Sequence, residues 1–269
     1  MRFNIGISPC PNDTYIFEAL AENKIDLNGI QFDFEYHDIA VLNQKSQKQE
    51  LDIIKISYAN YFQIAEEYIL LRSGGAMGYG VGPLLLSRKE ITPNQQHSCA
   101  IPGVSTTANF LLQYAFPKIQ NKTAVPFDKI EDALLNNDFD LGLVIHESRF
   151  TYKHKGLHKV LDLGAHWEEK EKLPIPLGGI AIKRNLAKDY GQKLNDLIVQ
   201  SIEWQEKQTD LSPYIQSHAQ EMEQRVMQQH INLYVNDFSK DVSADGEKAI
   251  EFMQKLLAPN LDESIFIEC

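Results

Sequence analysis

A histidine at the end of an apolar run is the first residue in this sequence with an evident chemical use. Residues 141–145 are aliphatic apart from one glycine, and the run stops at His146, with Glu147 and Arg149 close behind. An imidazole with the usual pKa of about 6.5 is mostly neutral near physiological pH, as a general base must be. Histidines in such places are also often structural, so catalysis and packing are both left as interpretations. The pattern does not settle whether Glu147 or Arg149 takes part.

A cluster of hydroxyl groups marks a second candidate site. Ser105, Thr106 and Thr107 follow a Pro-Gly pair and open a predicted helix over residues 106–114. The first amides of a helix lack partners inside the helix, and together with hydroxyls they suit a carboxylate or a phosphate. Helix capping alone would explain one threonine, although three consecutive hydroxyls exceed what capping needs. Anion binding and capping are therefore alternatives here.

The segment Ser8-Pro-Cys-Pro-Asn-Asp-Thr14 lies between the first predicted strand and the first predicted helix. Its two prolines restrict the backbone, and Asn12, Asp13 or Thr14 can cap the helix. In open α/β sheets, ligands bind outside the carboxyl ends of the strands, where this turn should lie. A rigid turn with a small buried thiol at Cys10 is the simpler interpretation, because nothing in the spacing marks Cys10 as a nucleophile.

The tripeptide Lys55-Ile-Ser57 ends a short predicted strand over residues 52–56. Ser57 can donate a hydrogen bond to an anion, and Lys55 can neutralise one. A surface lysine followed by a serine that caps a helix would look the same in the sequence.

The elements that must position these residues alternate between strand and helix, which favours an α/β fold. After residue 185 the pattern is almost entirely helical. Strands are predicted at 3–7, 30–36, 52–56, 84–86, 98–101, 122–125, 140–145, 160–163 and 179–182, and helices at 12–23, 39–50, 58–67, 106–114, 128–135 and 246–257.

The uneven distribution of strands predicts two lobes with a cleft between them. We expect one lobe to combine residues 1–87 with 180–269 and the other to contain residues 88–179, with the chain crossing near 84–89 and 174–183. The glycine-rich stretch 74–82 precedes a strand and contains neither GxGxxG nor a Walker A lysine, so it reads as a passage between lobes.

Composition limits the partners. The formal net charge of −11 opposes nucleic acid and anionic lipid, and no segment approaches the roughly 20 apolar residues that span a bilayer. The first residues lack a signal-peptide pattern, so a cytoplasmic protein is expected. The three cysteines form no CxxC pair, and no metal or organic cofactor is predicted. The expected partner is a small anionic substrate.

Five segments, taken in order, resemble the 1,4-dihydroxy-6-naphthoate synthase family. The resemblance covers about the first 185 residues well and the helical remainder more loosely. An ordered set of segments is far more specific than any one of them. The matching segments are Ser8-Pro-Cys-Pro-Asn-Asp-Thr14 with Tyr15-Ile-Phe17, Lys55-Ile-Ser57, Ser73-Gly-Gly-Ala-Met-Gly-Tyr-Gly-Val-Gly-Pro83, Thr106-Thr-Ala108 and Ile145-His-Glu147.

This resemblance implies a type II periplasmic-binding-protein-like fold without export. It implies a lyase of menaquinone biosynthesis that cleaves cyclic dehypoxanthine futalosine into 1,4-dihydroxy-6-naphthoate and a sugar-derived fragment. His146 would be the proton acceptor, and the substrate would be held by Lys55, Ile56, Ser57, Thr106, Thr107 and Ala108. The alternatives are a binding protein without catalysis, which uses the same cleft, and the sister chorismate dehydratase activity.

Overall fold

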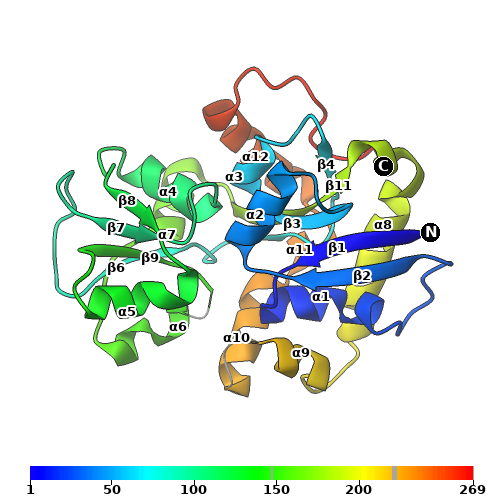
Figure 1. Cartoon of the computed structure of the whole chain (residues 1–269), viewed down its shortest axis with the longest axis horizontal. Coiled ribbons are helices and arrows are strands. Elements are labelled where there is room, and N and C mark those ends of the chain that lie inside the picture. Colours follow the sequence, from blue (N-terminus) through cyan, green and yellow to red (C-terminus); the bar gives the residue numbers. More distant parts are fainter. Residues whose placement is uncertain (147, 220–222, 269) are drawn as a thin grey trace.

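The computed structural model describes residues 1–146, 148–219 and 223–268, and within them the chain forms two β-sheets covered by helices (Figure 1). The first sheet has the strand order β2-β1-β3-β11-β4, with β5 also paired to β11. It contains β1 (Arg2–Ile7), β2 (Gln31–Tyr36), β3 (Ile53–Ser57), β4 (Tyr68–Leu70), β5 (Ala76–Gly78) and β11 (Ile175–Lys183).

The second sheet has the order β10-β6-β9-β7-β8 and lies beside the first (Figure 1). Its strands β7, β8 and β9 run parallel, whereas β6 is antiparallel to both of its neighbours. It contains β6 (Leu84–Ser87), β7 (Cys99–Ile101), β8 (Lys122–Ala124), β9 (Leu141–Val144) and β10 (His158–Asp162).

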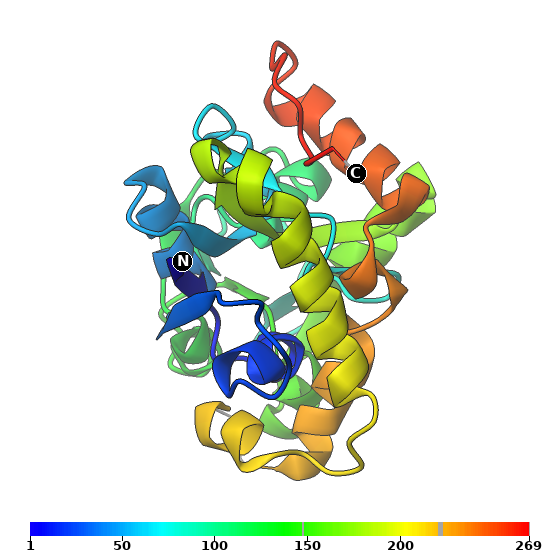
Figure 2. The same cartoon turned by 90° about the vertical axis from the view of Figure 1, so that its right-hand side faces the viewer.

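Twelve α-helices and two short 3-10 helices lie within the described ranges. Figure 2 shows the longest, α8, running across the side of the first sheet. The helices are α1 (Pro11–Ala21), α2 (Ile39–Gln47), α3 (Tyr58–Tyr61), α4 (Thr107–Ala115), α5 (Ile130–Leu135), α6 (Ser148–Thr151), α7 (Leu163–Glu171), α8 (Arg184–Gln205), α9 (Pro213–His218), α10 (Gln224–Tyr234), α11 (Asp237–Lys240) and α12 (Ser243–Leu257), with 3-10 turns at Phe127–Lys129 and Tyr152–Lys155.

Hydrophobic periodicity explains the central part of the first sheet. Phe3, Ile5 and Ile7 alternate along β1 and pack with apolar residues of α1 and α8 in one core cluster. All five residues of β3 are buried, because helices cover both faces of this inner strand. Two of these buried residues, Lys55 and Ser57, are polar, which is unusual for an inner strand. Both lie in the carboxyl-terminal half of β3, which marks this end of the strand as a candidate site.

Two helix predictions were wrong at their ends. The first helix begins at Pro11 with Cys10 as its N-cap, not Asn12 or Asp13, because proline fits the first helical position, where no amide partner is needed. The helix predicted over 58–67 ends at Tyr61. Residues 62–67 form turns instead. Their hydrogen bonds join residues three apart in sequence, such as the bond from the amide of Ile64 to the carbonyl of Tyr61.

The strand pairings bear on where the chain crosses between sheets. Strand β6 starts at Leu84 and belongs to the second sheet, and β11 starts at Ile175 and belongs to the first. Both crossings therefore lie a few residues before the predicted boundaries at 87/88 and 179/180. The division into two lobes stays a prediction. If each lobe contains one sheet, the strand pairings favour boundaries just before residue 84 and just before residue 175.

Candidate active site

A cavity lies between the two sheets, lined by residues from both and from α10. From the first sheet come the turn after β1 and the end of β3, and from the second come the start of α4 and the residues after β9. This is the position where open α/β sheets bind ligands. The lining includes Ser8, Asn12, Lys55, Ser57, Thr106, Thr107, Ala108, His146, His230 and Tyr234.

Almost all of the predicted site residues are brought together at this cavity. His146, Lys55 and Ser57 line it together with residues 106–108, although long stretches of sequence separate them. Ile56 does not line it. Successive side chains of a strand point to opposite faces, so Ile56 packs into the core while its two neighbours face the cavity.

Lys55 is a buried ion-pair partner, which excludes the alternative of a surface lysine. Only 4% of it is exposed. Its Nζ lies 2.8 Å from Oδ1 of Asp13 and donates to the carbonyl of Gly74 at 3.0 Å. The Asp13 carboxylate thus neutralises the ammonium inside the protein, so Lys55 offers a ligand no uncompensated charge.

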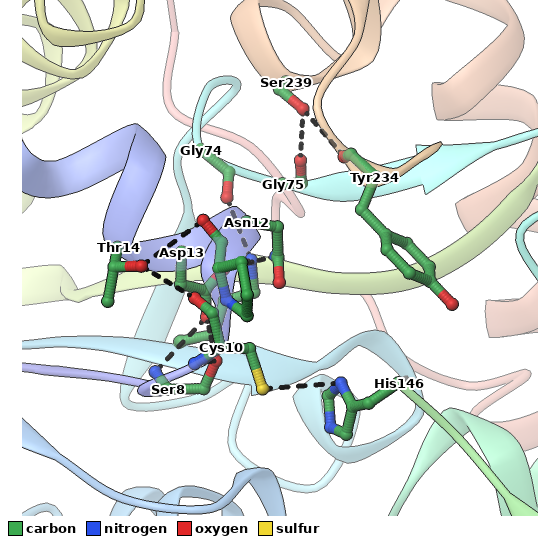
Figure 3. A network of polar contacts seen from close by, with 12 residues as sticks. Ser8, Cys10, Asn12, Asp13, Thr14, Gly74, Gly75, His146, Tyr234 and Ser239 are labelled. Atoms are coloured by element: carbon green, nitrogen blue, oxygen red, sulfur yellow. Dashed lines mark hydrogen bonds and ion pairs between the residues drawn. The ribbon is translucent and has the colours of Figure 1, made fainter. Parts of the chain in front are cut away.

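Asp13 organises the turn after β1 through both of its oxygens (Figure 3). Oδ2 accepts from the amide of Ser8 at 3.2 Å and from its hydroxyl at 2.7 Å. Oδ1 accepts from Lys55 and, at 2.8 Å, from Nδ2 of Asn12. A carboxylate with this many donors is firmly held, so the turn is a rigid wall of the cavity.

The hydroxyl groups divide into two kinds. Thr106 caps α4, because its Oγ1 accepts from the amide of Asn109 at 3.2 Å and donates to the carbonyl of Gly103 at 2.8 Å. Thr107 donates to the carbonyl of Leu177 at 2.8 Å. Both threonine hydrogens are thus committed to backbone, and capping is the function of the Thr106 hydroxyl.

Ser57 differs from the threonines. Its Oγ accepts from Nδ2 of Asn43 at 3.0 Å, and its amide donates to Oδ1 of the same asparagine at 2.9 Å. The hydroxyl makes no capping bond to α3, so the helix-cap alternative is wrong. Because the oxygen is an acceptor in this contact, its hydrogen is available to a ligand. Helix geometry also leaves the amides of Thr107 and Ala108 without partners inside α4. One hydroxyl and two amides of the cavity wall can therefore donate hydrogen bonds to a ligand.

His146 follows β9 in a left-handed backbone conformation, with φ of 57°. Such a conformation is costly for a residue with a side chain and is often found at functional sites. Its Nδ1 lies 3.5 Å from Sγ of Cys10 (Figure 3), and its ring meets that of Phe127 edge to face at 4.9 Å. These contacts hold the imidazole from two sides. Glu147 lies outside the described residues.

Arg149 also lines the cavity but is occupied by neighbours. Its guanidinium forms an ion pair with Asp162 at 2.9 Å and donates to the carbonyl of Gly82. Arg149 thus links Gly82, just before β6, to Asp162, the N-cap of α7. Its observed role is to stabilise this wall of the cavity.

His230 is a cavity residue that sequence reasoning missed. It is fully buried on α10, with its Nε2 2.9 Å from Oδ1 of Asn12. Its ring is nearly parallel to that of His146, at 17° and 6.0 Å between centroids. Burial first, and the nearby His146 second, lower the pKa of His230 well below its usual value. The sequence could have indicated His230, because it is a polar residue on the same apolar helix face as Met227 and Ile231.

The described residues hold no group of three or more side chains suited to a metal ion. In the same parts of the chain, every helix is too short or too polar to cross a bilayer.

Comparison with known proteins identifies relatives over nearly the whole chain. A family model described as menaquinone biosynthesis matches residues 3–259. A 1,4-dihydroxy-6-naphthoate synthase from Streptomyces coelicolor is 39% identical over 253 residues, covering 91% of this chain and 89% of that protein. The enzyme of the same name from Thermus thermophilus is 39% identical over 250 residues, covering 91% and 90%.

Solved structures confirm the architecture. The crystal structure of an Archaeoglobus fulgidus protein matches with a TM-score of 0.88 and 29% identity, covering 95% of this chain and 96% of that one. A Candida albicans protein described as having the generic periplasmic binding protein fold matches with a TM-score of 0.69 and 13% identity, covering 98% and 92%. The predicted periplasmic-binding-protein-like α/β fold is therefore confirmed.

Proposed function

The chain belongs to the menaquinone-biosynthesis family and is an enzyme of that pathway, and from this premise we propose how its cavity works. We propose that it is a lyase that converts cyclic dehypoxanthine futalosine to 1,4-dihydroxy-6-naphthoate, with His146 as the general base. The curated relatives carry the name of this activity. The observation that carries the proposed base is that His146 lines the same cavity as Ser57 and the first amides of α4.

The proposed reaction uses the two ends of the cavity differently. The aromatic carboxylate of the substrate is held by the Ser57 hydroxyl and the amides of Thr107 and Ala108, which favour negative charge. Anchoring that end places the sugar-derived ring beside His146. Removal of a proton by the imidazole opens this ring, and the naphthalene ring system becomes aromatic as the fragment leaves. General-base catalysis contributes on the order of 10²–10⁴-fold.

Lys55 fits this proposal as a residue that shapes the site. Its ammonium is paired with Asp13, so it supports the turn containing Ser8 and Asn12 rather than supplying an uncompensated charge. We further propose that the enzyme acts in the cytoplasm and needs no metal or organic cofactor, because proton removal followed by aromatisation requires only a positioned base.

His146→Asn tests the proposed base, since it keeps a side chain of similar shape and removes the basic nitrogen. We expect wild-type protein incubated with cyclic dehypoxanthine futalosine to form dihydroxynaphthoate, detected by mass spectrometry. The variant should lose at least about 10²-fold in kcat. His154→Asn, an exposed histidine outside the cavity, is the matched control and should keep full activity.

Three results would contradict parts of this proposal. Wild-type rates in His146→Asn would exclude His146 as the base. Wild-type protein that binds the cyclic compound without converting it would favour a binding protein. Loss of water from chorismate derivatives, with no turnover of the cyclic compound, would favour the sister dehydratase.

A further inference from the structure

The proposed reaction leaves the second imidazole of the cavity unused. His230 lines the cavity from α10, whereas His146 approaches from the end of β9. The ring of Tyr234, one helical turn further along α10, lies 4.6 Å from that of His230. Burying an imidazole is costly unless it is hydrogen-bonded, so the donor and acceptor roles of its two nitrogens decide what His230 can bind.

A chain of hydrogen bonds with fixed directions determines which nitrogen of His230 carries the proton. The carboxylate of Asp13, paired with Lys55, can only accept, so the group of Asn12 that contacts it must be the NH2. The Oδ1 of Asn12 then faces Nε2 of His230 at 2.9 Å as an acceptor. His230 must therefore donate through Nε2–H. Figure 3 shows the arrangement of Asn12 and Asp13 in this turn.

The other nitrogen follows from the first. A neutral imidazole has one donor and one acceptor nitrogen, so Nδ1 of His230 is the acceptor. Burial keeps the ring neutral, as its lowered pKa indicates. An acceptor nitrogen suits a ligand O–H group and is unsuited to a carboxylate, which has no hydrogen to donate when ionised. A ligand group that contacts Nδ1 must therefore donate a hydrogen, as a hydroxyl does.

We propose that His230 is a substrate-binding residue whose Nδ1 accepts a hydrogen bond from a hydroxyl of the sugar-derived part of the substrate. This rests on the proposed function. The near-parallel rings of His230 and His146 lie 6.0 Å apart, so a substrate segment held by one imidazole is within reach of the other. The substrate carboxylate is thus bound by hydrogen-bond donors, whereas the hydroxyl of the sugar-derived part is bound by an acceptor, Nδ1 of His230. His230 thereby positions the sugar-derived part next to His146.

A matched pair of substitutions separates this role from a structural one. In His230→Gln the amide NH2 lies near the position of Nε2 and can keep the bond to Asn12, but the acceptor at Nδ1 is lost. In His230→Asn the amide oxygen lies near the position of Nδ1 and keeps an acceptor, while the bond to Asn12 is lost. His154→Gln serves as the exposed control.

The measurements are kcat and KM for cyclic dehypoxanthine futalosine, and the Kd for dihydroxynaphthoate, which lacks the sugar-derived part. His230→Gln should lower kcat/KM by about 10-fold or more, leave the product Kd within about 2-fold, and unfold at the wild-type temperature. His230→Asn should lose less of kcat/KM despite its broken bond to Asn12.

The proposal is wrong if His230→Gln turns over the substrate like wild type, or if it weakens product binding as much as it lowers kcat/KM. A larger loss in His230→Asn than in His230→Gln would also overturn it, since that order identifies the bond to Asn12 as the important one. Wild-type protein that does not convert the cyclic compound contradicts the proposed function itself, and the role of His230 then falls with it.

Discussion

At the scale of single residues, the two imidazoles of the cavity differ in their surroundings. His146 is partly exposed, contacts a thiol and has a left-handed backbone conformation. His230 is fully buried and donates to the amide oxygen of Asn12. Their environments therefore suit different tasks, since proton transfer needs a group that can take up charge and the recognition of a hydroxyl needs one that stays neutral.

The buried state of His230 predicts how stability depends on pH. His230 faces His146, Asn12 and Tyr234, and its pKa in the folded protein is lowered, first by burial. In the unfolded chain it takes up a proton below about pH 6.5, whereas the folded state does not. The free energy of unfolding should therefore fall as pH drops below that value, by up to about 1.4 kcal/mol per pH unit from this group.

Urea unfolding of wild type and His230→Gln between about pH 5 and about pH 7.5 checks this. The two stability curves should separate toward acid pH, with wild type losing stability faster, because the variant lacks the group that binds the extra proton on unfolding. Parallel curves would show that His230 has similar pKa values in both states. His154→Gln should run parallel to wild type, since that side chain is exposed.

At the scale of elements, a buried ion pair joins the first turn of α1 to the carboxyl end of β3. Lys55 and Asp13 are 4% and 1% exposed, and the same carboxylate holds Ser8 and Asn12. Sheet register places Ile54 of β3 beside Gly6 of β1, so the turn that follows β1 lies close to Lys55. One carboxylate thereby fixes the relation of helix, strand and cavity wall.

Asp13→Asn should be strongly destabilising, because it leaves the buried ammonium of Lys55 without its charge partner. The expected loss in the free energy of unfolding is about 3–5 kcal/mol. Urea denaturation measures it. Asp245→Asn removes one partner of the exposed pair Asp245–Lys248 and is the matched control, with little expected change. Equal effects of the two substitutions would contradict a special role for burial.

At the scale of the whole molecule, the passage between the sheets is unusually tight. Gly82, just before β6, lies against Gly164 of α7, so that a Cβ added at Gly82 would be 2.2 Å from Cα of Gly164. The carbonyl of Gly82 also accepts from Arg149, which is paired with Asp162. Contacts with Gly164 and Arg149 therefore fix the position of Gly82, and with it the segment that passes from one sheet to the other beside the cavity. We propose that the two lobes meet here.

Gly82→Ala should force this passage apart, since the new methyl group meets backbone rather than a movable side chain. We expect a loss of about 1–3 kcal/mol in stability together with a lower kcat, because Gly82 lines the cavity. Gly80→Ala adds the same methyl group into open space at a left-handed position, so it should lose about 1–2 kcal/mol without a change in kcat. An unchanged kcat in Gly82→Ala would show that the passage does not shape the site.

Most of the architecture could be predicted because it depends on local periodicity. The alternation along residues 30–36 and the helical pattern after residue 185 correspond to β2 and to α8–α12. The candidate residues were also visible, since His146 and Ser57 end predicted strands and Thr106 lies in a hydroxyl cluster before a predicted helix. The family was recognisable from ordered segments, and the comparisons confirm it.

Only the tertiary structure decided the partners of these side chains. It paired Lys55 with Asp13, turned Ile56 into the core, assigned the Thr106 hydroxyl to a helix cap, and placed His230 beside His146. Each outcome depends on contacts between segments far apart in the chain, and His230 lies 218 residues from Asn12. Periodicity reports which face of an element is buried, whereas the direction of a hydrogen bond is set by the group that folding brings opposite.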